Sequence, residues 1–462
     1  MTQTVVVNPR VLEMEYAVRG PIPLRAAEIA AEGRRIVPCN IGNPQALGQA
    51  PISFYRSVLS LLEDPALLKR RMKDPAEFPS DVIELAASML EASRTGTGAY
   101  TDSAGFAFVR DAVAGFINSR DGFDAGSALA SHRRSVILTD GASGGAVFVL
   151  EALITGATDG ILVPIPQYPL YSATVARCGG TLVGYHPDEE AGWALHRDCL
   201  ERPLQQAQQR GLTVKAIVVI NPGNPTGAVL DEASMREVVQ FAADNGLAVI
   251  ADEVYQQNTY GRPWTSFAKV VGGDDVPLFS LHSVSKGFCG ECGHRGGYLE
   301  VRNPPRVQGT NLSLTDVLIK QASVNLCPNT MGQLLTYLLV TGPKAGTATY
   351  DTFVSERRRI LEDLRAKARM IRGYFSEMDG MRCFGETGAM YLFPRLDRLP
   401  AGGGDFEYCM ALLEETGMVT VNGAGFGQAP GTHHLRVAFL PSFELIEEVM
   451  PSWVRFHNRY VA

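Results

Sequence analysis

The chain has 462 residues, of which 45% are hydrophobic and 20% are charged, and its formal net charge is -7. A chain of this length exceeds one ordinary hydrophobic core, so two domains are expected. Because the sequence contains no basic tract that would follow a phosphate backbone, we expect no nucleic-acid partner.

The sequence also contains no pattern typical of a membrane or secreted protein. Its apolar runs stop well short of the about 18 to 20 residues that a membrane helix needs. Met1 to Arg10 lacks the apolar block of a secretory signal and the several arginines of a mitochondrial presequence. Eight cysteines are too few for a disulfide scaffold in a chain of this length and are expected to be reduced. We therefore expect a cytoplasmic protein with no membrane partner.

The opening segment, residues 1–71, differs in pattern from the rest of the chain. It contains several prolines, among them Pro9, Pro38 and Pro51, and shows no alternating hydrophobic pattern. We expect it to pack on a smaller domain formed by the end of the chain, or on a partner chain.

Residues 72–341 are expected to form a large α/β domain. From about residue 130 to residue 300, short apolar runs rich in Val, Ile and Leu alternate with helical patterns. Runs of this kind are typical of strands that are buried on both faces of a mostly parallel sheet. The seven expected strands are 136–139, 161–164, 181–185, 216–220, 247–251, 278–281 and 298–301.

One helix between these strands has clear boundaries. Asp231 can cap its first turn, and the apolar side chains of Met235, Val238 and Ala242 share one face. Gly246 can end the helix in a left-handed conformation. The pattern therefore predicts a helix between 231 and 246.

Residues 342–462 are expected to form the smaller domain. A long charged helical pattern at 355–378 is followed by shorter segments with aromatic residues and glycines. The glycine-rich stretch 423–427 lies outside the expected α/β part, and we interpret it as a turn.

The chemistry of the sequence centres on Lys286. It follows an expected strand in the stretch Ser-Val-Ser-Lys-Gly at 283–287 and lies in a loop with several further glycines. A lysine amine has an ordinary pKa near 10.4 and becomes nucleophilic near neutral pH when burial, cationic neighbours or imine formation lower that pKa. Alone, the segment would fit a surface lysine equally well, but the residues around Lys286 favour an imine with a phosphorylated pyridine aldehyde.

Such a ligand also needs a partner for its ring nitrogen. Asp252, at the end of an expected strand, can keep that nitrogen protonated so that the ring accepts electrons. A helix cap is the alternative role for Asp252. Asn224 and Tyr255, which follow neighbouring strands, can hydrogen-bond the 3-oxygen of the ring.

A phosphate site is expected where the stretch Gly-Ala-Ser-Gly-Gly at 141–145 joins a strand to a helix. Free N–H groups at the start of a helix carry about half a positive charge and favour an anion. Ser283 and Ser285 can add hydroxyl donors, and Arg295 can add a guanidinium group that donates bidentate hydrogen bonds.

With these residues in place, the chain resembles the fold-type I pyridoxal-phosphate aminotransferases of class I and, within that class, the alanine aminotransferases. The resemblance covers nearly the whole chain, although the pairs Asn43-Pro44 and Gly144-Gly145 depart from the family pattern. The segments that carry it are 8–12 (NPRVL), 16–21 (YAVRGP), 40–42 (NIG), 45–49 (QALGQ), 164–171 (PIPQYPLY), 221–227 (NPGNPTG), 251–256 (ADEVYQ), 290–298 (GECGHRGGY), 388–391 (GAMY), 413–417 (LEETG) and 425–428 (GFGQ).

The resemblance implies a fold and a set of roles. The implied fold has a large domain with a mixed, mostly parallel seven-stranded sheet and a smaller α+β domain made from both termini. The implied catalytic residues are Lys286, Asp252 and Tyr255, with Asn224 and Tyr255 facing the 3-oxygen and Tyr168 stacked on the cofactor ring. The implied phosphate ligands are Ala142, Ser143, Ser283, Ser285 and Arg295, with Tyr100 of the neighbouring subunit in a homodimer. The implied substrate-binding residues are Arg436, which would hold the α-carboxylate, Asn224 and Gly42.

The expected activity is a two-stage exchange in which L-alanine and 2-oxoglutarate give pyruvate and L-glutamate, with Lys286 moving the proton. A relative that uses glyoxylate as acceptor, a lyase or decarboxylase on the same scaffold, and a regulator that keeps the fold as a sensor are the alternatives. Cys289 and Cys292 have the spacing of half a zinc site or a redox pair, but no second such pair is present. We expect no metal.

Overall fold

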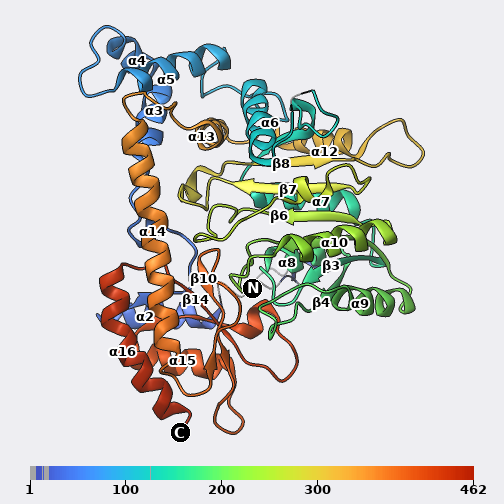
Figure 1. Cartoon of the computed structure of the whole chain (residues 1–462), viewed down its shortest axis with the longest axis vertical. Helices are drawn as coiled ribbons and strands as arrows, with labels where there is room; N and C mark the ends of the chain where they lie inside the picture. The colour runs from blue at the N-terminus through green and yellow to red at the C-terminus, as the bar shows by residue number, and fades with distance from the viewer. Residues whose placement is uncertain (1–6, 13, 15–19, 125) are drawn as a thin grey trace, which may run out of the picture.

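The central sheet of the computed structural model has seven strands in the order β2-β8-β7-β6-β5-β3-β4 (Figure 1). Only β8 runs against its neighbours, β2 and β7, and the other pairings are parallel. The structure describes residues 7–12, 14, 20–124 and 126–462. Residues 16–19 of the segment 16–21 lie outside this range. The expected mixed, mostly parallel sheet is confirmed.

The seven strands lie where the apolar runs predicted them, with small shifts at their ends. β3 and β5 begin earlier than expected because Asp159 and Thr213 pair in the ladder although neither is apolar. The strands of the sheet are β2 (Val136–Thr139), β3 (Asp159–Pro164), β4 (Thr181–Tyr185), β5 (Thr213–Ile220), β6 (Ala248–Asp252), β7 (Leu278–Ser283) and β8 (Gly297–Arg302).

Both faces of the sheet are covered, which explains the nearly continuous apolar runs. Along β5, Ile217 and Val219 face one cluster of buried side chains, and Ala216 and Val218 face the other. Helices α9, α10 and α11 contribute to the first cluster, and α7 and α8 contribute to the second. The helices of this part of the chain are α5 (Ser80–Ser93), α6 (Ala107–Asp121), α7 (Ala142–Leu153), α8 (Leu170–Cys178), α9 (Arg197–Gln209), α10 (Glu232–Asn245), α11 (Phe267–Val271), α12 (Leu314–Ala322) and α13 (Thr330–Thr341).

Helix α10 confirms the predicted boundaries between 231 and 246. The side chain of Asp231 accepts a hydrogen bond of 2.8 Å from the backbone N–H of Ser234, and Gly246 ends the helix in the left-handed conformation. Met235, Val238 and Ala242 are buried on the face toward the sheet.

Helices α2, α15 and α16 and strands β10 and β14 lie together in the lower part of Figure 1. Helix α14 (Tyr350–Phe375) is the long charged helix; it begins and ends slightly earlier than the pattern at 355–378. It runs along one side of the molecule from α3 and α4 to α15 and α16 (Figure 1). The other elements of this part are β9 (Met381–Arg382), β10 (Tyr391–Leu392), β11 (Arg395–Leu396), α15 (Asp405–Thr416), β12 (Met418–Val419), β13 (Val421–Asn422), β14 (Leu435–Ala438) and α16 (Phe443–Tyr460). The stretch 423–427 forms a short 3-10 turn over Gly423–Phe426.

The opening segment contacts both parts of the molecule. α2 (Pro21–Ala31) packs against α15 and β12, and β1 (Val37–Pro38) pairs in parallel with β12. α3 (Ser53–Glu63), which precedes α4 (Pro65–Arg71), instead packs against α5 and α13. The short α1 (Pro9–Leu12) contacts α8. The division of the chain at residues 71 and 341 stays a prediction. Across the described ranges, no helix combines the length and apolar character needed to cross a bilayer.

Gly145 allows α7 to lie close to the sheet. A Cβ atom at this position would lie 2.6 Å from Leu281 Cδ2 and 3.3 Å from Leu299 Cβ, whereas a Cβ at Gly144 would come no closer than 3.7 Å to its nearest neighbour, Thr139 Cβ. Gly145 therefore has a structural role, because its missing side chain sets the height of α7 above β7 and β8.

We expect Gly145→Ala to be less stable than Gly144→Ala by about 1 to 3 kcal/mol, the usual penalty for overpacking a core. Both changes gain similar helix propensity, so their difference isolates the contact with Leu281. Denaturant unfolding of the two variants without added ligand measures it. Equal midpoints would contradict the packing account.

Candidate active site

The ends of the sheet strands bring the predicted residues to one edge. Asp252 ends β6 and Ser283 ends β7, while Asn224 and Tyr168 follow β5 and β3. Arg295 lies just before β8, and because this strand runs in the opposite direction, its beginning lies at the same edge. Ligands of open α/β sheets bind outside the carboxyl ends of the strands, so this edge is the expected place for a site.

A cavity of about 250 Å³ opens at this edge. Twelve of the predicted residues line it, and Tyr100 does not; its side chain is 74% exposed on the surface. The predicted residues that line the cavity are Gly42, Ala142, Ser143, Tyr168, Asn224, Asp252, Tyr255, Ser283, Ser285, Lys286, Arg295 and Arg436.

Lys286, in the loop after β7, contacts the opening segment. Its Nζ donates a hydrogen bond of 2.7 Å to the carbonyl oxygen of Gly42 and lies 5.9 Å from the centre of the Tyr255 ring. The amine is therefore held at the wall of the cavity by one carbonyl group, in a position from which it can reach a bound ligand.

The predicted anion site lies around the start of α7, where Ser143, Arg295, Ser283 and Ser285 line the cavity together. Arg295 Nη2 donates to Ser143 Oγ at 3.0 Å and to Asp140 O at 2.8 Å, and Ser283 Oγ donates to Ser285 Oγ at 3.0 Å. The N–H groups of the first turn of α7 add partial positive charge. These donors have the number and sign that a phosphate group requires.

Gly141, just before α7, takes a backbone conformation that favours glycine, with φ of 74°. A Cβ atom there would lie 2.8 Å from Arg295 Nη2, closer than packed atoms approach. The glycine therefore lets the guanidinium lie against the start of the helix.

Asp252 is a buried carboxylate, with 5% of its surface exposed. Its Oδ2 accepts a hydrogen bond of 2.8 Å from the hydroxyl of Tyr171. Burial raises the pKa of Asp252 above its usual value, and the Tyr171 hydroxyl and the charge of Lys286 oppose that effect. A cationic group in the cavity would favour the charged form of Asp252.

Arg436, on β14, is a buried cation, with 2% of its surface exposed. Its Nη1 donates to Asn224 Oδ1 at 3.1 Å and its Nη2 donates to Asn40 O at 2.7 Å. The guanidinium also lies 4.3 Å from the Tyr391 ring and 4.6 Å from the Phe426 ring. Within the described residues its Nε has no hydrogen-bond partner. Because a buried charge without a counterion is costly, Arg436 is suited to bind a carboxylate.

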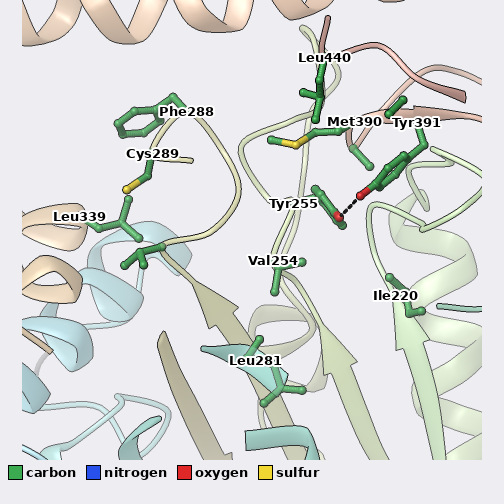
Figure 2. Packing of buried hydrophobic residues seen from close by; sticks show 14 of the residues in the cluster. Ile220, Val254, Tyr255, Leu281, Phe288, Cys289, Leu339, Met390, Tyr391 and Leu440 are labelled. Carbon is green, nitrogen blue, oxygen red and sulfur yellow. Dashed lines mark hydrogen bonds between the residues drawn. The ribbon is translucent and has the colours of Figure 1, made fainter. Parts of the chain in front are cut away.

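Tyr391 lines the cavity but was missing from the predicted site residues, although the segment 388–391 contains it. Figure 2 shows its hydroxyl facing that of Tyr255, and the two oxygens are 3.4 Å apart. Burial raises the pKa of Tyr255 well above 10. For Tyr391, burial acts in the same direction, but the charges of Lys286 and Arg436 outweigh it and lower its pKa. Tyr391 is therefore the more acidic phenol of the pair.

Gly42 must be a glycine in this arrangement. A Cβ atom there would overlap the hydroxyl of Tyr391 and lie 3.4 Å from Lys286 Nζ. Asn43 also lines the cavity. The opening segment thus supplies part of the wall beside the amine.

The two cysteines with metal-site spacing lie in different surroundings. Cys289 is buried between Phe288 and Leu339 in Figure 2, and burial raises the pKa of its thiol. Cys292 lines the cavity, and its Sγ donates to Ser285 O at 3.2 Å. In the described parts of the chain, no group of three or more His, Cys, Asp or Glu side chains is arranged to hold a metal ion.

The residues present fit pyridoxal phosphate. One cavity contains a primary amine (Lys286), a buried carboxylate (Asp252) that a cation would keep charged, and an anion site at the start of a helix. It also contains a buried guanidinium, Arg436, whose hydrogen-bond partners among the described residues are an amide oxygen and a backbone carbonyl and not a carboxylate. A phosphorylated pyridine aldehyde together with a carboxylate-bearing substrate would satisfy all four groups.

Comparisons with known proteins agree with this description. A family model described as aminotransferase class I and II matches residues 72–450. The chain is 44% identical to glutamate–glyoxylate aminotransferase 2 of Arabidopsis thaliana, over 98% of this chain and 95% of that protein. It is 42% identical to alanine aminotransferase 2 of Panicum miliaceum, over 98% of this chain and 97% of that protein. Among solved structures, alanine aminotransferase from Pyrococcus furiosus matches with a TM-score of 0.79 and 26% identity, over 98% of this chain and 100% of that one.

We expect Arg295→Gln to weaken the binding of pyridoxal phosphate about tenfold to a hundredfold, the usual effect of removing a hydrogen bond to a charged group. Binding of pyridoxal, which lacks the phosphate, should change little. Equilibrium titration by absorbance measures both ligands, with the exposed Arg306→Gln as control. An equal loss for both ligands would contradict the assignment of Arg295 to the phosphate.

Proposed function

Because the chain belongs to the class I and II aminotransferase family, we propose that it transfers the amino group of L-alanine to 2-oxoglutarate, giving pyruvate and L-glutamate. Its cofactor is pyridoxal phosphate, on which this family depends. The similarity to an alanine aminotransferase of Panicum miliaceum supports the choice of substrates.

The observation that carries the proposal is the position of Lys286. Its amine lines the same cavity as Asp252, Arg295 and Arg436, and the Gly42 carbonyl holds it at 2.7 Å. The three other groups carry the charges that a ring nitrogen, a phosphate and a substrate carboxylate require. Amino transfer uses the amine of Lys286 together with these three charged groups.

In the proposed mechanism, the anion site holds the phosphate and Asp252 holds the proton on the ring nitrogen. Pyridoxal phosphate, when bound, supplies a carbonyl group that takes up the substrate amine and a ring that accepts electrons. Tyr168 is the proposed stacking residue on the ring, and Asn224 and Tyr255 are the proposed partners of its 3-oxygen. The protein itself positions the reactants and moves protons.

Arg436 is the proposed binding group for the substrate α-carboxylate, with Asn224 and Gly42 beside it. A planar guanidinium can donate two parallel hydrogen bonds to a carboxylate and so fix its orientation. With the carboxylate held, Lys286 Nζ can remove the proton from the α-carbon and later return a proton. Tyr391, whose ring packs on Arg436, lines this part of the cavity.

Two further features belong to the proposal. A homodimer belongs to the proposal, with Tyr100, which is exposed on the single chain, as the residue that would reach the phosphate of the neighbouring subunit. A cytoplasmic location stays a prediction.

The second candidate is an enzyme that uses glyoxylate as acceptor. The similarity to a glutamate–glyoxylate aminotransferase of Arabidopsis thaliana favours it about equally, because the identities are 44% and 42%.

A substrate panel separates the two candidates. With L-glutamate as donor and added pyridoxal phosphate, we expect the purified protein to form alanine from pyruvate faster than glycine from glyoxylate. Initial rates at matched concentrations, measured by amino-acid analysis, give the comparison. A faster reaction with glyoxylate would favour the second candidate, and ammonia release without any keto acid would indicate a lyase.

Replacing Lys286 with alanine should reduce amino transfer by about a thousandfold or more, because the variant loses both the covalent attachment and the proton-transfer group. The absorbance of the imine should also be lost, while the circular dichroism spectrum stays the same. Lys320→Ala, on the exposed side of α12, is the matched control. Near-normal turnover in Lys286→Ala would refute the assignment.

A further inference from the structure

Tyr171 lies behind the carboxylate of Asp252 and does not line the cavity. Its side chain is fully buried, and its hydroxyl donates a hydrogen bond of 2.8 Å to Asp252 Oδ2. The other carboxylate oxygen, Oδ1, accepts a long hydrogen bond of 3.4 Å from the backbone N–H of Val254. One oxygen of Asp252 is thus firmly held, and the other keeps capacity for a donor in the cavity.

The hydrogen bond from Tyr171 favours one charge state of Asp252. Burial raises the pKa of Tyr171 well above 10, so the phenol keeps its proton and acts as a donor. A donor stabilises the charged carboxylate, and this opposes the burial that raises the pKa of Asp252. Without this hydroxyl, Asp252 would lose a donor that is out of contact with solvent.

The placement of Tyr171 follows from the chain around it. Tyr168 lines the cavity, α8 begins at Leu170, and the backbone N–H of Tyr171 donates to Tyr168 O at 3.3 Å. The segment between β3 and α8 therefore places Tyr168 at the cavity wall and Tyr171 behind the carboxylate of Asp252.

The geometry points to Tyr171 as a positioning residue that holds Asp252 ionised and oriented toward the ring nitrogen of the cofactor. This inference rests on the role of Asp252 in the proposed function. Tyr171 contacts neither substrate nor cofactor in this account and acts only through the carboxylate.

The test compares two cofactors in purified protein. In 1-deazapyridoxal phosphate a C–H group replaces the ring nitrogen, so it can form the imine and bind the anion site but has no nitrogen to pair with Asp252. We expect Tyr171→Phe to weaken the binding of pyridoxal phosphate about tenfold, the lower end of the usual effect of losing a hydrogen bond to a charge. Binding of the deaza analogue should change less than twofold. Absorbance titration gives both dissociation constants.

A double-mutant cycle with Asp252→Asn shows whether Tyr171 acts through the carboxylate. In the Asp252→Asn background, adding Tyr171→Phe should cause no further loss of preference for pyridoxal phosphate over the analogue. Tyr185→Phe is the matched control, because its fully buried hydroxyl also donates a hydrogen bond of 2.8 Å, to Val218 O on the same sheet. It should lower the unfolding midpoint without changing that preference.

The outcomes separate this inference from the proposed function. Equal losses for the two cofactors in Tyr171→Phe, or an undiminished loss in the Asp252→Asn background, would mean that Tyr171 has only a structural role. If Asp252→Asn itself leaves the preference unchanged, the role of Asp252 in the proposed function is wrong, and the inference about Tyr171 is wrong with it.

Discussion

Six strands of the central sheet run in one direction, and β8 alone runs against them. Because of this arrangement, the ends of β3, β5, β6 and β7, and the beginning of β8, lie at one edge of the sheet. β6 and β7 are paired on both sides, so the side chains of Asp252 and Ser283 at their ends are held on rigid elements. Residues as far apart in the chain as Ser143 and Arg295 contact each other there. The candidate site depends on this shared strand direction.

Burial determines which ligands the charged side chains of the site can bind. Asp252 and Arg436 are both almost fully enclosed, and a charged group in such surroundings needs an opposite charge. The protein supplies partial compensation through Tyr171 and Asn224. The charge that is left uncompensated on Asp252 matches a cationic ring nitrogen, and the charge left on Arg436 matches a substrate carboxylate. Lys286, held by a carbonyl group from the opening segment, lies in the same cavity and can act on what they bind.

Much of this could be predicted from the sequence because it depends on local patterns. Asp252 and Lys286 stood out as polar residues at the ends of apolar runs, and the helix after Asp231 had capping signals at both ends. The role of Arg436 came from the resemblance alone, since an arginine in a short strand is ordinary. The structure places it in the cavity, and its function there is still a proposal.

Other contacts could not be found in this way. Gly42 was implied by the resemblance, but its contact with Lys286 joins residues 244 positions apart, and nothing local at Gly42 indicates it. Tyr171 looks like any aromatic residue of a buried helix; the one signal is that a buried tyrosine hydroxyl usually needs a partner. Tyr391 lay in a recognised segment, but its contact with Arg436 depends on the pairing of β10 with β14.

The central claim is that these residues transfer an amino group in two separate stages. The most direct test mixes the cofactor-loaded protein with L-alanine in the absence of any keto acid and measures pyruvate over time. The account predicts about one pyruvate per cofactor-bearing chain, after which the reaction stops until 2-oxoglutarate is added and glutamate forms. Continuous pyruvate formation with release of ammonia, or no pyruvate at all, would contradict it.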